Sequence, residues 1–281
     1  MTRIAFVNDA FVPYAEARVS IADRGFLFAD GVYEVSAVLD GRLIDNDAHL
    51  VRLARSLREL RIADPFARER WVALQEELVR RNALREGLVY LQVTRGAAER
   101  DFAFPREAMP TVVMFTQAKT ILDSSLARTG AAVISTPDIR WARRDIKSVA
   151  LLAQVLAKQA AAEAGVAEAW MVEDGVVTEG SSSTAFIITR AGAIRTRPLS
   201  NAILPGVTRR AVLALAAEAG LAIEERAFTL DEAKDAAEAF FTSASSFVMP
   251  VVALDGVRIG DGAPGPRARR LRELYVALAL A

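Results

Sequence analysis

Two residues of opposite charge, Lys147 and Glu179, could take part in one chemical reaction, because of their residue types and their order along the chain. Lys147 lies in the stretch from Arg140 to Ser148, and Glu179 lies in the run Thr178-Glu-Gly-Ser-Ser-Ser183. A lysine amine can hold an aldehyde cofactor as a Schiff base. A carboxylate can keep a pyridine nitrogen protonated, so that the ring accepts electrons from a substrate carbanion. The pair therefore suggests a pyridoxal phosphate site and the chemistry of amino-group transfer.

The segments around Lys147 distinguish it from an ordinary surface lysine. Residues 131–135 are predicted as a buried strand, residues 137–144 as an irregular crossing, and residues 148–164 as a helix that ends at Gly165. Lys147 is therefore expected just before a helix N-terminus. There the helix dipole and a desolvated pocket would both disfavour its ammonium form, which suits a nucleophilic amine.

Two further segments could bind a phosphate. In residues 203–220 a Pro-Gly turn opens an apolar helix, and the N–H groups of Gly206, Val207 and Thr208 would be its unsatisfied first-turn donors. Residues 240–246 form a strand that runs into small hydroxyl residues, a second possible source of donors. Taken alone, an ordinary capped helix and a simple turn are the better interpretations of these two segments.

Six short motifs in a fixed order make the chain resemble the fold-type IV pyridoxal phosphate enzymes, which include branched-chain and D-amino acid aminotransferases. The motifs are residues 23–34, 49–53, 93–96, 145–148, 178–183 and 203–208. The resemblance extends from Asn8 to beyond Pro250 and is greatest to the D-amino acid aminotransferases. It implies a two-domain α/β (α+β) chain with the site between the domains, a homodimer, and pyridoxal 5'-phosphate as the cofactor.

The resemblance also assigns roles to individual residues. Lys147 would be the catalytic residue, which forms the Schiff base and shuttles a proton between the substrate alpha carbon and the cofactor. Glu179 would pair with the pyridine nitrogen, and Arg52 would bind the phosphate through its paired guanidinium donors. The other implied cofactor contacts come from Leu204, Gly206, Val207, Thr208, Ser243 and Ala244. The implied substrate contacts come from Tyr33, Arg100 and Phe102.

Three positions depart from the D-amino acid pattern. Phe102 stands where a histidine is often found, so an apolar ring replaces a donor, and larger apolar substrates or amines without a carboxylate stay open. Ala244 stands where a threonine hydroxyl often contacts the phosphate, so only its backbone N–H can contribute. Ala150 stands where asparagine is common, a difference that the sequence does not explain.

Length and periodicity predict the domain organisation. At 281 residues the chain exceeds a typical domain of ~150 residues. Residues 1–117 are expected to form a small α/β domain, in which leucines at helical spacing in residues 50–60 face a core. Residues 118–130 lose periodicity and are the expected connection, and residues 131–281 form the larger cofactor-binding domain.

Two local predictions concern the larger domain. Residues 169–172 and 183–188 are expected to pair as strands around a turn at residues 173–175. Residues 229–232 have the pattern of a capping box that begins a helix.

Composition disfavours several other classes of protein. The chain has 35 Lys and Arg against 35 Asp and Glu, so it has no overall positive charge that would favour nucleic-acid binding. The basic cluster 267–272 is expected to be a solvated helix face. No apolar run approaches the ~20 residues of a membrane span, and residues 1–8 lack a signal-peptide core, so a cytoplasmic protein is expected. The chain has no cysteine, and its one histidine, His49, is expected near Arg52 and makes a metal cluster or serine triad hard to assemble.

The activity that the resemblance implies is transfer of an amino group from a D-amino acid, such as D-alanine, to 2-oxoglutarate or pyruvate. The alternatives are a branched-chain L-amino acid aminotransferase, an (R)-selective amine transaminase, and 4-amino-4-deoxychorismate lyase, which would eliminate pyruvate. An interpretation from a different class is a non-catalytic protein that binds pyridoxal phosphate.

Overall fold

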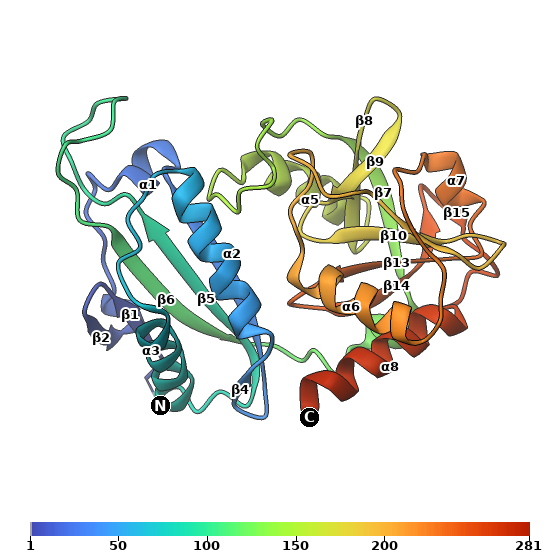
Figure 1. Cartoon of the computed structure of the whole chain (residues 1–281), viewed down its shortest axis with the longest axis horizontal. Coiled ribbons are helices and arrows are strands. Elements are labelled where there is room, and N and C mark those ends of the chain that lie inside the picture. Colours follow the sequence, from blue (N-terminus) through green and yellow to red (C-terminus); the bar gives the residue numbers. More distant parts are fainter. Residues whose placement is uncertain (1) are drawn as a thin grey trace. The chain divides into compact units, whose positions relative to one another are not determined.

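The structure is a computed structural model that describes residues 2–281, which divide into two compact units (Figure 1). Unit 1 contains residues 2–120 together with Ile146–Ala150, and unit 2 contains Ile121–Asp145 and Leu151–Ala281. The segment Ile146–Ala150 thus belongs to unit 1, although the chain on both sides of it belongs to unit 2. Both units combine sheets and helices, which confirms the expected mixed α/β class.

Unit 1 is built on a six-stranded sheet with the order β2-β1-β6-β5-β3-β4. All its strand pairs are antiparallel. The strands are β1 Ile4–Val7, β2 Ala10–Pro13, β3 Gly31–Leu39, β4 Arg42–Leu43, β5 Glu86–Thr94 and β6 Thr111–Ala118. The helices are η1 Tyr14–Glu16, α1 Arg24–Phe28, α2 Asn46–Glu59 and α3 Arg68–Arg81.

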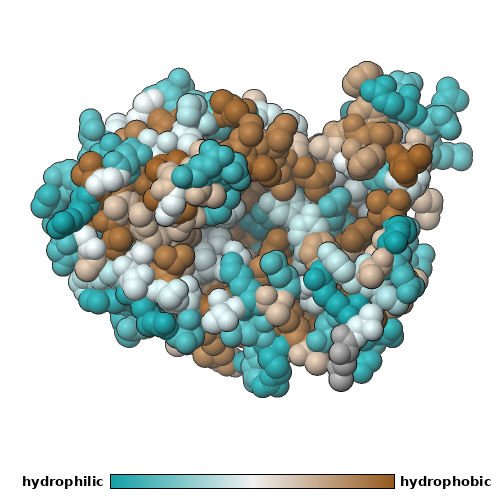
Figure 2. All heavy atoms as spheres, turned by 180° about the vertical axis from the view of Figure 1, so that it is seen from behind, coloured by the Kyte–Doolittle hydropathy of each residue, from teal (hydrophilic) through white to brown (hydrophobic). Residues whose placement is uncertain are grey.

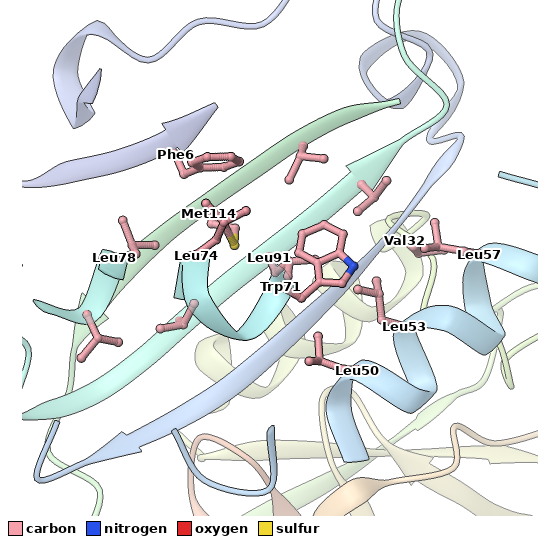
Figure 3. Close-up of a cluster of buried hydrophobic side chains, with 14 of the residues drawn as sticks. Phe6, Val32, Leu50, Leu53, Leu57, Trp71, Leu74, Leu78, Leu91 and Met114 are labelled. Atoms are coloured by element: carbon pink, nitrogen blue, oxygen red, sulfur yellow. The ribbon is translucent and has the colours of Figure 1, made fainter. Parts of the chain in front are cut away.

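One hydrophobic core joins this sheet to α2 and α3 (Figure 3). Leu50, Leu53 and Leu57 lie one helical turn apart on α2, and all three are buried, as their spacing predicts. They share the core with Trp71 of α3 and Met114 of β6. The core fixes α2, and with it the side chains that α2 carries toward β3.

Unit 2 is built on a nine-stranded sheet with the order β12-β11-β10-β13-β14-β7-β8-β9, in which β15 pairs with β14. Its strands are β7 Ala131–Pro137, β8 Glu168–Glu173, β9 Val176–Gly180, β10 Thr184–Ile188, β11 Ile194–Thr196, β12 Ile223–Glu225, β13 Glu238–Ser243, β14 Phe247–Leu254 and β15 Val257–Arg258. Its helices are α4 Ser125–Thr129, α5 Leu152–Glu163, α6 Val207–Glu218, α7 Leu230–Lys234 and α8 Pro266–Leu280. The stacked rings of Phe186 and Phe240, 4.6 Å apart, join β10 to β13.

One predicted strand pair is wrong. The strand that pairs with β8 across the expected turn is β9, which was not predicted as a strand, whereas β10 pairs with β11 and β13. The turn is tight because Asp174 and Gly175 have φ values of 52° and 76°, the left-handed conformations of a two-residue hairpin. The chain therefore reverses at once, and residues 176–180 occupy the place beside β8.

Two other expected segments differ in their boundaries or content. The helix predicted from residue 148 begins at Leu152, because residues 147–149 hydrogen-bond to β3 around an isolated Val32–Ser148 bridge. The stretch 118–130 contains the end of β6 and the short helix α4. The capping box at Thr229 is present and begins α7, as predicted. Within residues 2–281, no helix combines the length and apolarity that crossing a membrane requires.

Candidate active site

Hydrogen bonds on both peptide groups of Lys147 join it to the main chain of β3 and to the side chain of Ser56 on α2. The Tyr33 N–H donates to the Lys147 carbonyl at 3.0 Å, and the Lys147 N–H donates to Ser56 Oγ at 3.3 Å. The Lys147 Nζ lies 4.2 Å from the centroid of the Tyr33 ring. The structure therefore brings together two of the predicted site residues, the lysine and the tyrosine.

The predicted position of Lys147 next to a helix is wrong. Helix α5 begins five residues later, at Leu152, and helix dipoles act within about one turn of the helix end. Instead of a helix, the bridge between Ser148 and Val32 positions the Lys147 amine. Periodicity could not show this, because the pairing joins segments far apart in the sequence.

Arg52 lies on α2 and is fixed by a buried glutamate of β3. Its Nε and Nη2 donate to the two carboxylate oxygens of Glu34, both at 2.8 Å, and His49 Nδ1 lies 2.8 Å from Glu34 Oε2. Burial alone would raise the pKa of Glu34, but the charge and hydrogen bonds of Arg52, with His49, lower it to about 2. The expected proximity of His49 and Arg52 is confirmed, and Glu34, which holds both, is a residue that sequence reasoning missed.

Glu179 lies one residue before the end of β9 and has a buried carboxylate. The Leu204 N–H donates to Oε1 and to Oε2, at 3.2 Å each, and Arg140 Nη1 forms a charged hydrogen bond with Oε1. Leu204 was predicted to lie on the cofactor ring, and the structure shows that its backbone contacts Glu179. A buried carboxylate oriented by these partners can accept a hydrogen bond from a ligand.

Arg140 is itself oriented by a carboxylate with no exposed surface, that of Asp138. Arg140 Nε and Nη2 donate to Asp138 Oδ1 and Oδ2 at 2.9 and 2.6 Å, and Thr178 Oγ1 donates to Oδ2 at 2.6 Å. Burial would lower the pKa of Arg140, but its hydrogen bond with Asp138 and the charges of Glu179 and Asp138 raise it. Sequence reasoning did not assign either residue, and the alternating pair Asp138-x-Arg140 after a buried strand is the signal that could have found them.

The N-terminus of α6 has the free donors that the sequence predicts. Its N-cap is Gly206, which has no side chain to cap the helix. The N–H groups of Val207 and Thr208 bond to no acceptor in the part of the chain that the structure describes. A Cβ added at Gly206 would lie 2.9 Å from Thr184 Oγ1 and 3.1 Å from Arg209 Cβ, so a larger residue would crowd this end of the helix. The arrangement can receive an anion.

Hydroxyl groups gather where β10 and β13 run side by side. Thr184 of β10 is the register partner of Thr242 of β13. Thr242 Oγ1 is buried and has no hydrogen-bond partner among the described residues. The Oγ of the next residue, Ser243, lies 3.2 Å from Ser245 Oγ and 2.7 Å from Ser246 Oγ. The predicted strand end is confirmed, and Ala244 lies in the turn that follows it.

Arg100 and Phe102 lie together in a loop between β5 and β6. The Arg100 guanidinium lies 5.5 Å from the Phe102 ring and 5.2 Å from the Phe28 ring, which themselves are 5.4 Å apart. Arg24 donates to the carbonyls of Asp101 and Phe102 at 2.6 and 3.4 Å and so fixes the loop backbone. Phe102 is nevertheless 78% exposed. Its ring is therefore available to a ligand or to another protein surface.

Comparison with known proteins gives one consistent result. The chain matches the family model described as Amino-transferase class IV over residues 31–254. A D-alanine aminotransferase of Bacillus licheniformis is 40% identical over 265 residues, which cover 94% of this chain and 93% of that protein. A branched-chain amino acid aminotransferase from T.th., solved with pyridoxamine 5'-phosphate, has a TM-score of 0.92 at 27% identity, over 99% of this chain and 94% of that chain. The same enzyme complexed with N-(5'-phosphopyridoxyl)-L-glutamate has a TM-score of 0.89 at 29% identity, with the same coverage.

Proposed function

We propose that this chain, which belongs to the amino-transferase class IV family, moves an amino group from a D-amino acid such as D-alanine to a 2-oxo acid. The observation that carries the proposal is the contact of Glu179 with the Leu204 N–H. It joins a buried carboxylate to the segment that leads directly into the uncapped N-terminus of α6. A pyridine ring with a phosphate arm needs these two features, a proton acceptor and an anion site, at a short separation.

The residues of unit 2 fit pyridoxal 5'-phosphate, the cofactor of class IV aminotransferases. Gly206, Val207 and Thr208 would bind the phosphate, because two of their N–H groups have no acceptor and Gly206 leaves the approach open. The Ser243 hydroxyl and the Ala244 N–H would add donors from the turn after β13. Glu179, oriented by its hydrogen bond from Arg140, would accept a hydrogen bond from the pyridine N–H, and Leu204 would contact the ring.

Unit 1 would supply the reactive amine. When bound, the cofactor supplies an aldehyde that bonds to amines and a ring that accepts electrons. Lys147 Nζ would hold that aldehyde covalently and later carry the proton that leaves the substrate alpha carbon. The Tyr33 ring, 4.2 Å from Nζ, would limit the directions in which the amine can point. Arg52, fixed by Glu34, would present its guanidinium to the phosphate.

Tyr33, Arg100 and Phe102 are the proposed substrate contacts. The relatives at 40% identity are D-alanine aminotransferases, which supports a D-amino acid donor. A branched-chain L-amino acid is the second candidate, because solved branched-chain enzymes match the chain at 27% and 29% identity. Arg100 supports the first candidate through the resemblance alone, because it matches the arginine expected to bind the substrate carboxylate in D-amino acid enzymes. The exposed Phe102 ring favours a larger apolar group.

We also propose that the protein works as a homodimer in the cytoplasm. Several large hydrophobic side chains are more than two-thirds exposed, among them Ile21, Phe26 and Met109 of unit 1 and Leu152 of unit 2. Figure 2 shows hydrophobic side chains gathered in several places on the face it displays. Burial against a second copy would remove such surface from water.

The test of the proposed function is the visible absorbance of the purified protein with pyridoxal 5'-phosphate, before and after single amino donors. D-alanine alone should abolish the absorbance band of the lysine-bound cofactor, and a 2-oxo acid should restore it. L-Leucine or (R)-1-phenylethylamine acting in place of D-alanine would transfer the assignment to a branched-chain or amine transaminase. Pyruvate released from 4-amino-4-deoxychorismate without a 2-oxo acid would transfer it to a lyase.

Two lysine variants separate the cofactor assignment from general effects. Lys147→Ala should lose the band and turnover while its circular dichroism stays that of the parent. Lys158→Ala removes an exposed lysine of α5 and should retain both. Substantial turnover in Lys147→Ala, or no band in the parent protein at all, would show that the proposed role of Lys147 is wrong.

A further inference from the structure

The turn between β13 and β14 contains a residue in a strained conformation. Ala244, Ser245 and Ser246 connect the paired residues Ser243 and Phe247, and Phe247 has a φ of 58°. Three-residue hairpin loops commonly need one left-handed residue, which is usually glycine because it has no Cβ. A phenylalanine adopts this conformation only when its surroundings hold it there. The turn that carries Ser243 and Ala244 is therefore maintained by contacts outside itself.

Those contacts come from α8, which packs beside β14 (Figure 1). Arg272 Nη1 donates to the Ser246 carbonyl at 2.8 Å and to the Val248 carbonyl at 2.9 Å, the two residues that flank Phe247. The Tyr275 ring meets the Phe247 ring edge to face, with their centroids 4.9 Å apart. Arg272 and Tyr275 are three positions apart and so lie on one face of the helix. Together they fix the backbone on both sides of Phe247 and its side chain.

The other terminal nitrogen of the Arg272 guanidinium contacts the first residues of unit 2. Nη2 donates to the Ile121 carbonyl at 2.6 Å and to the Leu122 carbonyl at 3.3 Å. Arg272 was predicted to lie on a solvated basic face, but the structure shows it partly buried, whereas Arg269 and Arg270 are exposed as expected. In the described chain its partners are carbonyl oxygens and no carboxylate.

Among residues 2–281, no carboxylate pairs with Arg272 to neutralise its charge. Burial lowers the pKa of Arg272, because a guanidinium loses solvation inside the protein. Main-chain carbonyls satisfy its donors but carry no net charge, so its positive field extends to the neighbouring turn. An anion bound by that turn would be attracted by this field.

We propose that Arg272 and Tyr275 are positioning residues that hold the turn from Ser243 to Phe247 in the conformation that binds the cofactor phosphate. Arg272 adds the field of a partly buried cation that contacts carbonyl oxygens and no carboxylate in the described chain. The inference rests on the proposed function, because it needs Ser243 and Ala244 to contact the phosphate. It predicts that residues of α8 which touch no ligand set the affinity for the phosphate group.

The test compares two probes that differ only in the phosphate, pyridoxal 5'-phosphate and pyridoxal. Their dissociation constants are measured by absorbance titration for the parent, Arg272→Gln, Arg272→Lys and the control Arg270→Gln. Arg270 lies on the same helix, is 65% exposed and pairs with Glu273, so its loss should change neither constant. Arg272→Gln should weaken pyridoxal 5'-phosphate about tenfold, the size expected for losing hydrogen bonds to a charged group, and leave pyridoxal unchanged.

The two arginine variants also separate positioning from charge. Arg272→Lys keeps the cation but cannot bond to four carbonyls, so a dissociation constant between those of the parent and Arg272→Gln supports both contributions. The 31P resonance of the bound cofactor should shift in both variants, and thermal unfolding and circular dichroism verify that they fold.

Three results would overturn the inference. The first is an unchanged constant for pyridoxal 5'-phosphate in a folded Arg272→Gln protein. The second is an equal loss for both probes, which would mean that α8 acts on the ring site in general. The third is a parent protein that binds neither probe, which would overturn the proposed function itself.

Discussion

Replacing Glu34 with glutamine tests whether the buried carboxylate under Arg52 stabilises the fold. The Glu34 side chain is 1% exposed and accepts hydrogen bonds from Arg52 Nε and Nη2, and His49 Nδ1 lies within hydrogen-bond distance of it. Glutamine has nearly the same shape, but it removes the negative charge and presents an amide to the guanidinium. Arg52 would then remain buried without its carboxylate partner.

The size of the effect follows from the pKa of Glu34. Burial raises this pKa and Arg52 with His49 lowers it, with a net change from an ordinary value of 4.5 to about 2. At about 1.4 kcal/mol for each pKa unit, the ionised form contributes about 3 kcal/mol to stability near pH 7. This agrees with the ~3–5 kcal/mol usually lost when one partner of a buried ion pair is removed.

The assay is urea unfolding of the parent and Glu34→Gln at several pH values. Because the pKa of Glu34 is lower in the folded state, its contribution is complete above the unfolded pKa and is lost as pH falls toward 2. The difference between the two proteins should therefore be about 3 kcal/mol at pH 7 and about half of that at pH 3. A difference that is independent of pH would refute the electrostatic reasoning.

Glu77→Gln is a matched control on α3. Hydrogen bonds from Arg80 and Arg81 also lower the pKa of Glu77 to about 2. These two partners are, however, 72% and 42% exposed, so water screens the interaction and the arginines stay solvated when the carboxylate is lost. Glu77→Gln should change stability much less than Glu34→Gln. An equal loss would mean that burial does not determine the effect.

Two further substitutions test local features of unit 2. Thr229→Ala removes the side chain that caps α7 and should cost about 1 kcal/mol in urea unfolding, whereas Ser124→Ala, at an N-cap without a side-chain bond, should cost almost nothing. Equal losses would contradict the capping argument. Gly206→Ala places a Cβ 2.9 Å from Thr184 Oγ1 and should cost about 1–3 kcal/mol of stability as well as affinity for pyridoxal 5'-phosphate. Unchanged affinity would place the phosphate elsewhere.

The features that the sequence predicted correctly depend on neighbouring residues. The start of α6 after Gly206 and the capping box at Thr229 each depend on residues within a few positions of the chain. The leucines of α2 repeat at the period of the helix they form. Local geometry fixes such features, so one sequence is enough to find them.

The features that it missed depend on contacts between distant segments. Lys147 was placed beside a helix because the apolar run after it has helical periodicity, but residues 147–149 bond to β3, which lies far earlier in the chain. Residues 176–180 were not recognised as a strand, and β10 was assigned to their place, because a short apolar run does not specify its partner. Strand order and register are properties of the assembled sheet, so no short segment of the sequence contains them.

A common pattern links three of the proposed cofactor contacts, each of which is held by a residue from another part of the chain. Glu34 of β3 fixes Arg52 of α2, and Arg140 fixes the Glu179 carboxylate. Arg272 of α8 fixes the turn after Ser243. Family resemblance named only the residues expected to touch the ligand, since those carry its motifs. Such a site needs residues that hold the contacting side chains in place, because a side chain free to rotate would lose entropy on binding. Affinity in this protein is therefore expected to respond to substitutions at residues that never meet the cofactor.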